Sequence, residues 1–177
     1  IRIDRAGWRK PPFGFKFKGA KKLGTVVGKP KPSSGKPQIE WNRELFMTGV
    51  GGDLCSYGLF MDDDTFTTIT GTWFASCDFA NVYVAEGHER KGPTIEITGG
   101  IIFNAGNPFH NDPNRPSRVE NADDNHHGAI INGGELAMNG VMVKNNKGIG
   151  LVIGEKVRGY TVNGCTFTGN AGIGAQL

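Results

Sequence analysis

Residues 134–177, GELAMNGVMVKNNKGIGLVIGEKVRGYTVNGCTFTGNAGIGAQL, contain one pattern twice. Five pairs of residues recur at an interval of 24 positions: Gly140 and Gly164, Val143 and Phe167, Asn146 and Asn170, Gly148 and Gly172, and Gly150 and Gly174. An accident of composition does not keep five pairs in phase. A fixed period of this length is typical of solenoid proteins, in which each repeat packs only against its neighbours.

The same pattern extends upstream when insertions are allowed. The pieces NGVMV at 139–143 and NGCTF at 163–167 resemble GGIIF at 99–103 and TGTWF at 70–74. This alignment places Gly71, Gly100, Gly140 and Gly164 at one position, followed three residues later by Phe74, Phe103, Val143 and Phe167. A second column aligns HHGAII at 126–131, GIGLVI at 148–153 and GIGAQL at 172–177, and ELAM at 135–138 aligns with GYTV at 159–162. Each repeat therefore contains about three short strands, separated by turn sequences such as NNKG, GEKVRG and GNAG.

One geometry satisfies such a repeat. If each repeat makes one circuit and rises by about 4.8 Å, its backbone groups hydrogen bond to the coils on both sides. Inward side chains then stack, so Phe74, Phe103, Val143 and Phe167 form one internal column, each contributing roughly 1.5–3 kcal/mol by burial. Two further inward columns are expected, Met138 with Val162 and Ile130 with Val152. Asn125, Asn146 and Asn170 are expected to hydrogen bond along a corner. A β-sandwich also uses short strands, but its strands are antiparallel and need no fixed repeat.

Two stretches, NGVMVKNNKGIGLVIG at 139–154 and YTVNGCTFTGNAGIGAQL at 160–177, resemble the coils of right-handed parallel β-helix proteins. That family includes pectate lyases, polygalacturonases and bacteriophage tailspikes, and the tailspikes are the most similar members. The resemblance covers residues 66–177 well, 46–65 weakly and 1–45 hardly at all. It implies an all-β, right-handed parallel β-helix over residues 46–177. Because the chain stops at Leu177, inside a third copy of the GIG strand, we expect this β-helix to be truncated at its C-terminal end.

Residues 1–45 differ in composition from the rest of the chain. They hold twelve Lys and Arg against three Asp and Glu, a local charge of +9 within a total of +3. The stretch GKPKPSSGKP at 28–37 favours an extended linker, whereas Phe13, Phe15 and Phe17 alternate with lysines as in a strand with one apolar face. We predict an extended, basic linker or attachment segment that does not bind nucleic acid, with a boundary near residues 38–45.

Composition excludes several other classes of protein. The chain has 28 Gly, 9 Pro and 37% hydrophobic residues, which disfavours long helices, and no apolar run is long enough to span a membrane. Its three cysteines lack the CxxC spacing of a zinc site, so buried thiols are expected. The sequence predicts no metal and no cofactor. The start at Ile1 leaves room for a removed leader or an upstream domain.

Candidate catalytic residues lie in one long insertion. The 40 residues between Gly100 and Gly140 exceed one repeat by sixteen, and solenoid insertions are loops that often carry the binding face. The candidates for catalysis are Glu120, Asp123, Asp124, His126 and His127, and the candidates for glycan contact are Arg115 and Arg118. The segment DDNHHG at 123–128 is similar to the acidic pair and His-Gly of polygalacturonases and to the Asp-His-His of pectate lyases. It departs from both, because the first set is spread over several coils and Asn125 interrupts the second.

The alternative is that these acids only solvate a turn and that the two histidines begin a strand. The coils themselves supply no acidic pair in register, because Glu96 aligns with Leu136 and Tyr160, Glu135 aligns with Gly159, and Glu155 lies in a turn. A glycosidase needs two carboxyl groups at a defined separation, so the acidic pair of such an enzyme would have to come from the inserted loop, from another chain or from further coils.

Aromatic residues offer a second kind of ligand site. Trp73 adjoins the inward Phe74 and should face outward by strand alternation, which makes it the best aromatic candidate for stacking on a sugar. Trp41 and Tyr83 are weaker candidates, and Arg90 in the turn GHERKG could bind a sugar carboxylate or remain a solvated arginine.

Three functions fit these features. The first is a tailspike or tail-fibre segment in the virion tail that binds a host cell-surface polysaccharide, with depolymerisation left open. The second is a secreted polysaccharide-cleaving enzyme similar to pectate lyases or polygalacturonases, and the third is a noncatalytic adhesin or spacer. The linker-like basic segment, the absence of disulfide pairs and the lack of an intact lyase or hydrolase motif favour the first. The resemblance further implies a homotrimer, joined to other tail or baseplate proteins through residues 1–45.

Overall fold

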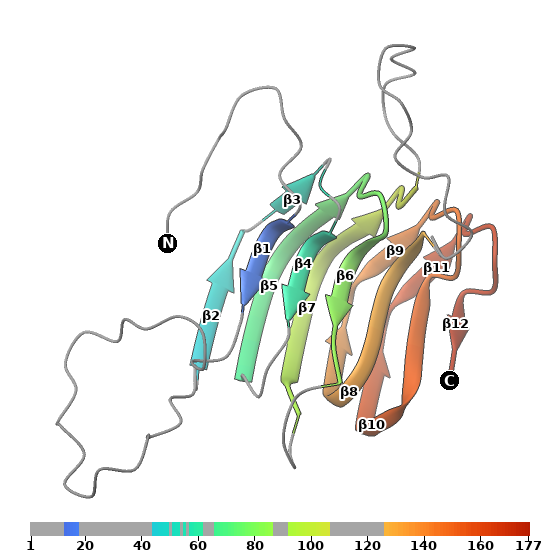
Figure 1. Ribbon diagram of the computed structural model, residues 1–177. Helices are drawn as coiled ribbons and strands as arrows, with labels where there is room; N and C mark the ends of the chain where they lie inside the picture. The colour runs from blue at the N-terminus through green and yellow to red at the C-terminus, as the bar shows by residue number, and fades with distance from the viewer. Residues whose placement is uncertain are drawn as a thin grey trace, which may run out of the picture.

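The protein is a parallel β-solenoid. Its computed structural model describes residues 13–17, 44–49, 51–53, 55, 57–61, 66–86, 92–106 and 126–177. Within these residues every strand pairing is parallel, and the chain makes about four turns, with the strands side by side along the molecule (Figure 1). Parallel pairing confirms the predicted all-β solenoid and excludes the β-sandwich. The right-handed sense stays a prediction, which the strong right-handed preference of parallel crossovers favours.

Most strands have two to five residues, and the four that turn a corner, β5, β7, β8 and β10, have 10 or 13. Their bounds are β1 Phe13–Phe17, β2 Glu44–Thr48, β3 Gly51–Asp53, β4 Tyr57–Met61, β5 Phe66–Ala75 and β6 Ala80–Val84. They continue as β7 Thr94–Phe103, β8 His127–Asn139, β9 Met142–Lys144, β10 Leu151–Asn163, β11 Thr166–Thr168 and β12 Ala175–Gln176. No helix in the described part of the chain is long and apolar enough to cross a membrane.

Three ladders form the walls of the solenoid. The first joins β2, β5, β7, β8 and β10, the second joins β3, β5, β7, β9 and β11, and the third joins β1, β4, β6, β8, β10 and β12. Residues 13–17 are therefore a strand of the third wall, as the alternating phenylalanines predicted. The proposed boundary at residues 38–43 lies outside the described residues.

The core consists of like side chains stacked from coil to coil. Its main columns are Phe74, Ile102, Val143 and Phe167; Ile69, Ile97, Met138 and Val162; and Leu59, Val82, Ala129 and Leu151. Most of these side chains are fully buried. Because burying one such side chain is worth roughly 1.5–3 kcal/mol, the columns supply the main driving force for winding.

The predicted column containing Phe103 was wrong by one residue. Thr72 pairs with Gly100, and Phe74 pairs with Ile102, so Gly99 is the glycine that corresponds to Gly71 and Phe103 faces outward. A shift of one residue moves every side chain of a strand to the other face, and the doublet Gly99–Gly100 hid this shift in the sequence. The same slip corrects Glu96, which pairs with Ala137 and not with Leu136.

The predicted turn GEKVRG is also different in the structure. Strand β10 runs through residues 154–159, with register shifts against β8 between Ile153 and Lys156 and between Val157 and Gly159. Such irregularities take up extra residues without ending the strand. Glu155 therefore lies in β10 and not in a turn. Two exposed ion pairs flank the irregularity, Lys156–Glu86 at 2.6 Å and Arg158–Glu135 at 3.1 Å.

A buried amide ladder crosses one corner of the coils. Asn146 donates from Nδ2 to Asn170 Oδ1 at 2.8 Å, which confirms the predicted contact between these two residues. Asn125 lies outside the described residues, and the third member is Asn81, whose Nδ2 donates to Asn146 Oδ1 at 3.1 Å. The ladder also binds backbone groups, because Ala105 N–H donates to Asn146 Oδ1 at 2.9 Å. Each amide thereby satisfies polar groups that the corner would otherwise bury unpaired.

Candidate functional site: the outward face of the second wall

The outward face of β5, β7 and β9 carries a contiguous set of apolar and aromatic side chains. In the ladder, Trp73 pairs with Ile101 and Ile101 with Met142, so these three side chains form one row across three coils. The next outward row places Phe103 beside Lys144. We call Trp73, Ile101, Phe103, Met142 and Lys144 the Trp73 face.

Strand alternation explains why these residues point away from the core. Phe74, Ile102 and Val143 lie between them in the sequence and are fully buried. Trp73 is 56% exposed and Met142 is 40% exposed, whereas Ile101 and Phe103 are half-buried. The outward phase predicted for Trp73 is thus present in the structure.

Two ring interactions organise the Trp73 face. The ring centroids of Trp73 and Phe103 lie 5.8 Å apart at an interplanar angle of 50°. Lys144 Nζ lies 5.9 Å from the centroid of Phe103, a distance at which a cation is attracted to the ring. The face therefore presents a broad indole, an adjoining phenyl ring and one positive charge. Sequence reasoning found Trp73 alone, because the one-residue slip had placed Phe103 in the core.

A second aromatic cluster lies outside β4 and β6. It contains Tyr57, Phe60, Phe79 and Tyr83, with neighbouring ring centroids 5.2–5.3 Å apart. Phe60 and Tyr83 are stacked at only 7°, so each ring covers one face of the other. These side chains are half-buried and pack mainly on one another, which leaves less ring surface for a ligand than Trp73 offers. Trp41, the other aromatic candidate, lies outside the described residues.

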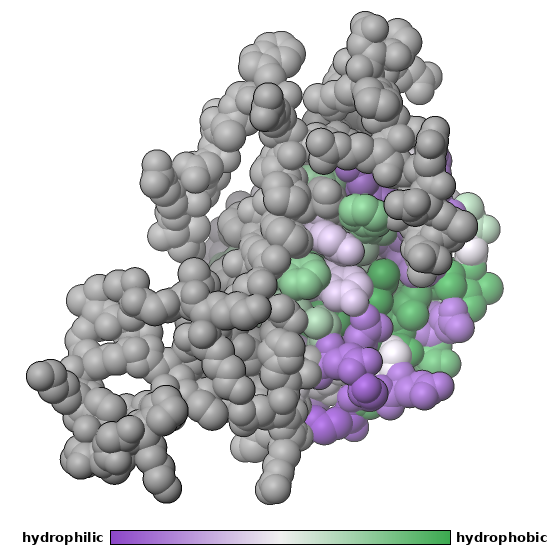
Figure 2. Space-filling model, viewed as in Figure 1, coloured by the Kyte–Doolittle hydropathy of each residue, from purple (hydrophilic) through white to green (hydrophobic). Residues whose placement is uncertain are grey.

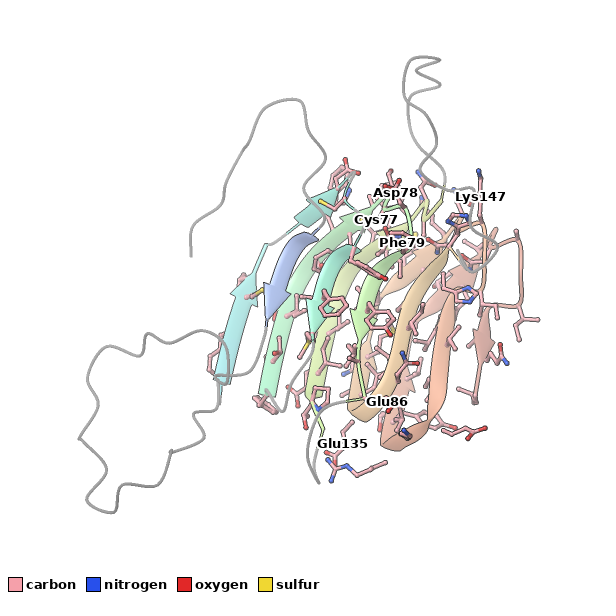
Figure 3. All side chains as sticks on the ribbon, in the orientation of Figure 1. Cys77, Asp78, Phe79, Glu86, Glu135 and Lys147 are labelled. Carbon is pink, nitrogen blue, oxygen red and sulfur yellow. The ribbon has the colours of Figure 1, made fainter. Side chains whose placement is uncertain are left out.

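The third wall continues this cluster with aliphatic side chains. Tyr83 pairs with Ile130, and Ile130 with Val152, so an apolar outward row runs from β6 to β10. The predicted inward column of Ile130 and Val152 was therefore wrong, because their neighbours Ala129 and Leu151 are the buried residues of these strands. Figure 2 shows apolar residues in the middle of the visible face and hydrophilic residues along its lower edge. Figure 3 places Glu86 and Glu135, which form the two ion pairs, at the lower edge of the strands, and Asp78 and Lys147 at the upper edge.

The two candidate catalytic histidines lie at the start of β8 and have opposite hydrogen-bonding roles. His126 Nδ1 lies 2.6 Å from the carbonyl oxygen of Asp78. Because a carbonyl only accepts, Nδ1 carries the proton and Nε2 of the neutral ring does not. The backbone N–H of Ile149 donates to His127 Nδ1 at 2.8 Å, so the neutral His127 ring carries its proton on Nε2. In these two contacts the unprotonated nitrogen of His127, Nδ1, accepts a backbone N–H, whereas the unprotonated nitrogen of His126, Nε2, is not used.

The environment of His127 favours its neutral form. Burial lowers the pKa of His127, and the neighbouring His126 lowers it further. A neutral imidazole is required for Nδ1 to accept the Ile149 N–H. His127 therefore links neighbouring coils through its Nδ1, and a catalytic role for it stays a prediction.

The remaining predicted site residues lie outside the described residues: Glu120, Asp123, Asp124, Arg90, Arg115 and Arg118. Among the residues that the structure describes, no group of three His, Cys, Asp or Glu side chains is arranged to hold a metal ion. Three acids on the coils have polar partners: Glu86 and Glu135 form ion pairs, and Glu96 Oε2 accepts from Thr68 at 3.4 Å.

A scan against models of protein families, a search of curated proteins and a search of solved structures each found no match.

Proposed function

We propose that the chain is a segment of a bacteriophage tailspike or tail fibre that binds a host surface polysaccharide on the Trp73 face. The observation that carries the proposal is the exposed indole of Trp73 at the end of an apolar row, with Phe103 and Lys144 beside it. Sugar rings have apolar C–H faces and polar rims. An exposed indole stacks on the first, and hydrogen-bonding or charged groups at the edge bind the second.

The solenoid wall suits an extended ligand. Parallel coils place equivalent positions about 4.8 Å apart along a flat surface, so a row of side chains can contact successive parts of one chain molecule. Many modest contacts then add up without a deep pocket.

Trp73→Ala tests the proposal directly. We expect the dissociation constant for purified host capsule or lipopolysaccharide to rise about fivefold, because one lost stacking contact is worth on the order of 1 kcal/mol. Isothermal titration calorimetry measures this change. The matched control is Phe46→Ala, since Phe46 is 66% exposed on β2 of the neighbouring wall and should leave the affinity unchanged. Equal affinity of wild type and Trp73→Ala, with unchanged circular dichroism, would reject the role.

Cleavage of the bound glycan is a separable part of the proposal. In this part of the proposal, Glu120, Asp123 and Asp124 supply the catalytic carboxyl groups. His126 is the better placed of the two histidines to act as a base, because its Nε2 can accept a proton. Incubation with purified glycan followed by mass spectrometry distinguishes the cases: unchanged mass means binding alone, added water means hydrolysis, and an unsaturated end means a lyase. Light scattering tests the accompanying proposal of a homotrimer attached through residues 1–45.

A further inference from the structure

Two cysteines occupy the same corner position in neighbouring coils. One backbone hydrogen bond recurs at this corner: Asp78 N–H to Cys55 O at 2.8 Å, Gly106 N–H to Cys77 O at 2.8 Å, Lys147 N–H to Ala105 O at 3.0 Å, and Ala171 N–H to Asn146 O at 2.9 Å. The acceptors of successive coils therefore form one column, Cys55, Cys77, Ala105 and Asn146, and Asn170 follows them. Cys55 and Cys77 are its first two members in the described residues.

The first four residues of this column, Cys55, Cys77, Ala105 and Asn146, are buried. Cys55 and Cys77 are both buried, and neither is in a disulfide. Farther along the column, the amides of Asn146 and Asn170 touch at 2.8 Å, which shows that consecutive positions bring side chains into contact. The two thiols also have equivalent orientations, since Cys55 Sγ donates to Asp53 O and Cys77 Sγ donates to Ala75 O, each at 3.2 Å.

The coil spacing suits a covalent bridge. Neighbouring strands lie about 4.8 Å apart, and disulfides join residues whose Cα atoms are about 4.4–6.8 Å apart. Closure requires both thiols to rotate away from their carbonyl acceptors and the two Cβ atoms to approach by a few tenths of an ångström. Residues 76–79 are not part of a strand, so this corner can take up that movement more easily than a ladder position.

We propose that Cys55 and Cys77 are a latent disulfide that closes between coils when the protein meets a small-molecule disulfide such as oxidised glutathione. One cysteine, as thiolate, attacks a sulfur of the glutathione disulfide, forms a mixed disulfide and releases one glutathione thiolate. The second cysteine attacks the protein sulfur of that mixed disulfide and releases the second glutathione. The two thiol protons end on the two released glutathione molecules, so two protein thiols are oxidised and one small disulfide is reduced.

The surroundings of the pair make this reaction slow at neutral pH. Burial raises the pKa of Cys77; a hydrogen bond from the Cys55 backbone partly offsets this increase, and the charges of the Cys55 thiolate and of the Asp53 and Asp78 carboxylates add to it. The thiolate is the attacking species, so little of it is present near pH 7. The rate of closure should therefore increase with pH, while the buried bridge, once formed, is protected from reductants.

The test uses the folded chain, incubated with oxidised glutathione at increasing pH and then quenched with acid. Cleavage with cyanogen bromide after Met61, which lies between the two cysteines, separates Cys55 from Cys77 unless they are bridged. We expect the two fragments to remain joined, with an intact mass lower by two hydrogen atoms, and to separate on reduction. Bridging should also raise Tm by roughly 5–10 °C, because it closes a loop of about twenty residues.

Two variants control the experiment. Cys165→Ala should still form the bridge, because Cys165 lies in another column, where its Sγ donates to Asn163 O and Met138 O. Cys77→Ala should form none, whatever its stability. The proposal is overturned if the fragments separate without reduction while Cys165, which is only partly buried, becomes glutathionylated in the same sample. Glutathione attached to Cys55 or Cys77 without a bridge overturns it equally.

Discussion

Asn146 joins three coils through a single buried side chain. Its Oδ1 accepts from Ala105 N–H and from Asn81 Nδ2, and its Nδ2 donates to Asn170 Oδ1. A buried amide with this many partners stabilises a corner, because the backbone and side-chain groups it binds have no access to water.

Asn146→Ala is expected to lower the free energy of unfolding by about 2–4 kcal/mol, because it leaves buried donors without partners. Urea unfolding measures the loss. Asn163→Ala is the control, since Asn163 is exposed on β10 and should change stability by less than about 0.5 kcal/mol. Similar losses in both variants would contradict the importance of the ladder.

His127 makes stability depend on pH. Its pKa is lowered in the folded state, so the unfolded chain takes up a proton first as the pH falls. Stability is therefore full above the ordinary histidine pKa of about 6.5 and declines as the pH falls through that value toward the lowered pKa. His127→Gln keeps an acceptor for Ile149 N–H but cannot titrate. The difference between wild type and variant in urea midpoints from pH 8 to pH 5 should show this decline, and parallel curves would contradict it.

The glycine at the corner between the first and second walls determines which side chains of the following strand point inward. Gly71, Gly99, Gly140 and Gly164 occupy this corner in successive coils, all with φ between 57° and 65°. Only a residue tolerant of the left-handed region turns the chain there at low cost. Gly100 has a different role, because a Cβ at this residue would lie 2.2 Å from the carbonyl oxygen of Thr72.

Two alanine substitutions test this register. Gly99→Ala meets no atom within 4 Å and should cost about 1–2 kcal/mol for its left-handed φ alone. Gly100→Ala carries a similar conformational cost at φ 95° and also collides with the Thr72 backbone, so it should cost at least twice as much. Urea midpoints of the two variants decide the matter. If Gly99→Ala is the more damaging, the pairing of Thr72 with Gly100 is wrong.

On the scale of the whole molecule, a solenoid distributes its stability between neighbouring coils. Ile69 and Ile97 are paired in adjacent coils. Leu151 lies in β10, on another wall and two coils beyond the coil of Ile69. Substitutions in contact are energetically coupled, and distant ones are additive.

A double-mutant comparison tests this one-dimensional behaviour. The loss of unfolding free energy in the double variant Ile69→Ala/Ile97→Ala should differ from the sum of the two single losses by about 0.5–3 kcal/mol. Ile69→Ala combined with Leu151→Ala should equal the sum within about 0.5 kcal/mol. Strong coupling of the distant pair would show that the protein does not behave as a stack of coils.

Several features follow from the sequence alone. The interval of 24 residues predicted parallel coils and the contact of Asn146 with Asn170, and the alternating phenylalanines predicted the strand of residues 13–17. These predictions are correct because the repeat length and the alternation of side chains can be read from a short stretch of sequence. When successive coils have the same number of residues, equivalent residues occupy equivalent positions. The outward phase of Trp73 depends on the same local alternation with Phe74.

Only the tertiary structure decided the features that depend on coils of unequal length. It placed Phe103 beside Trp73, brought Asn81 into the amide ladder and stacked Cys55 on Cys77. Where two glycines adjoin, or a coil is longer than 24 residues, several registers fit the same letters. Hydrogen bonds and packing between coils select one of them, because a slip by a single residue would turn the buried face of a strand toward water.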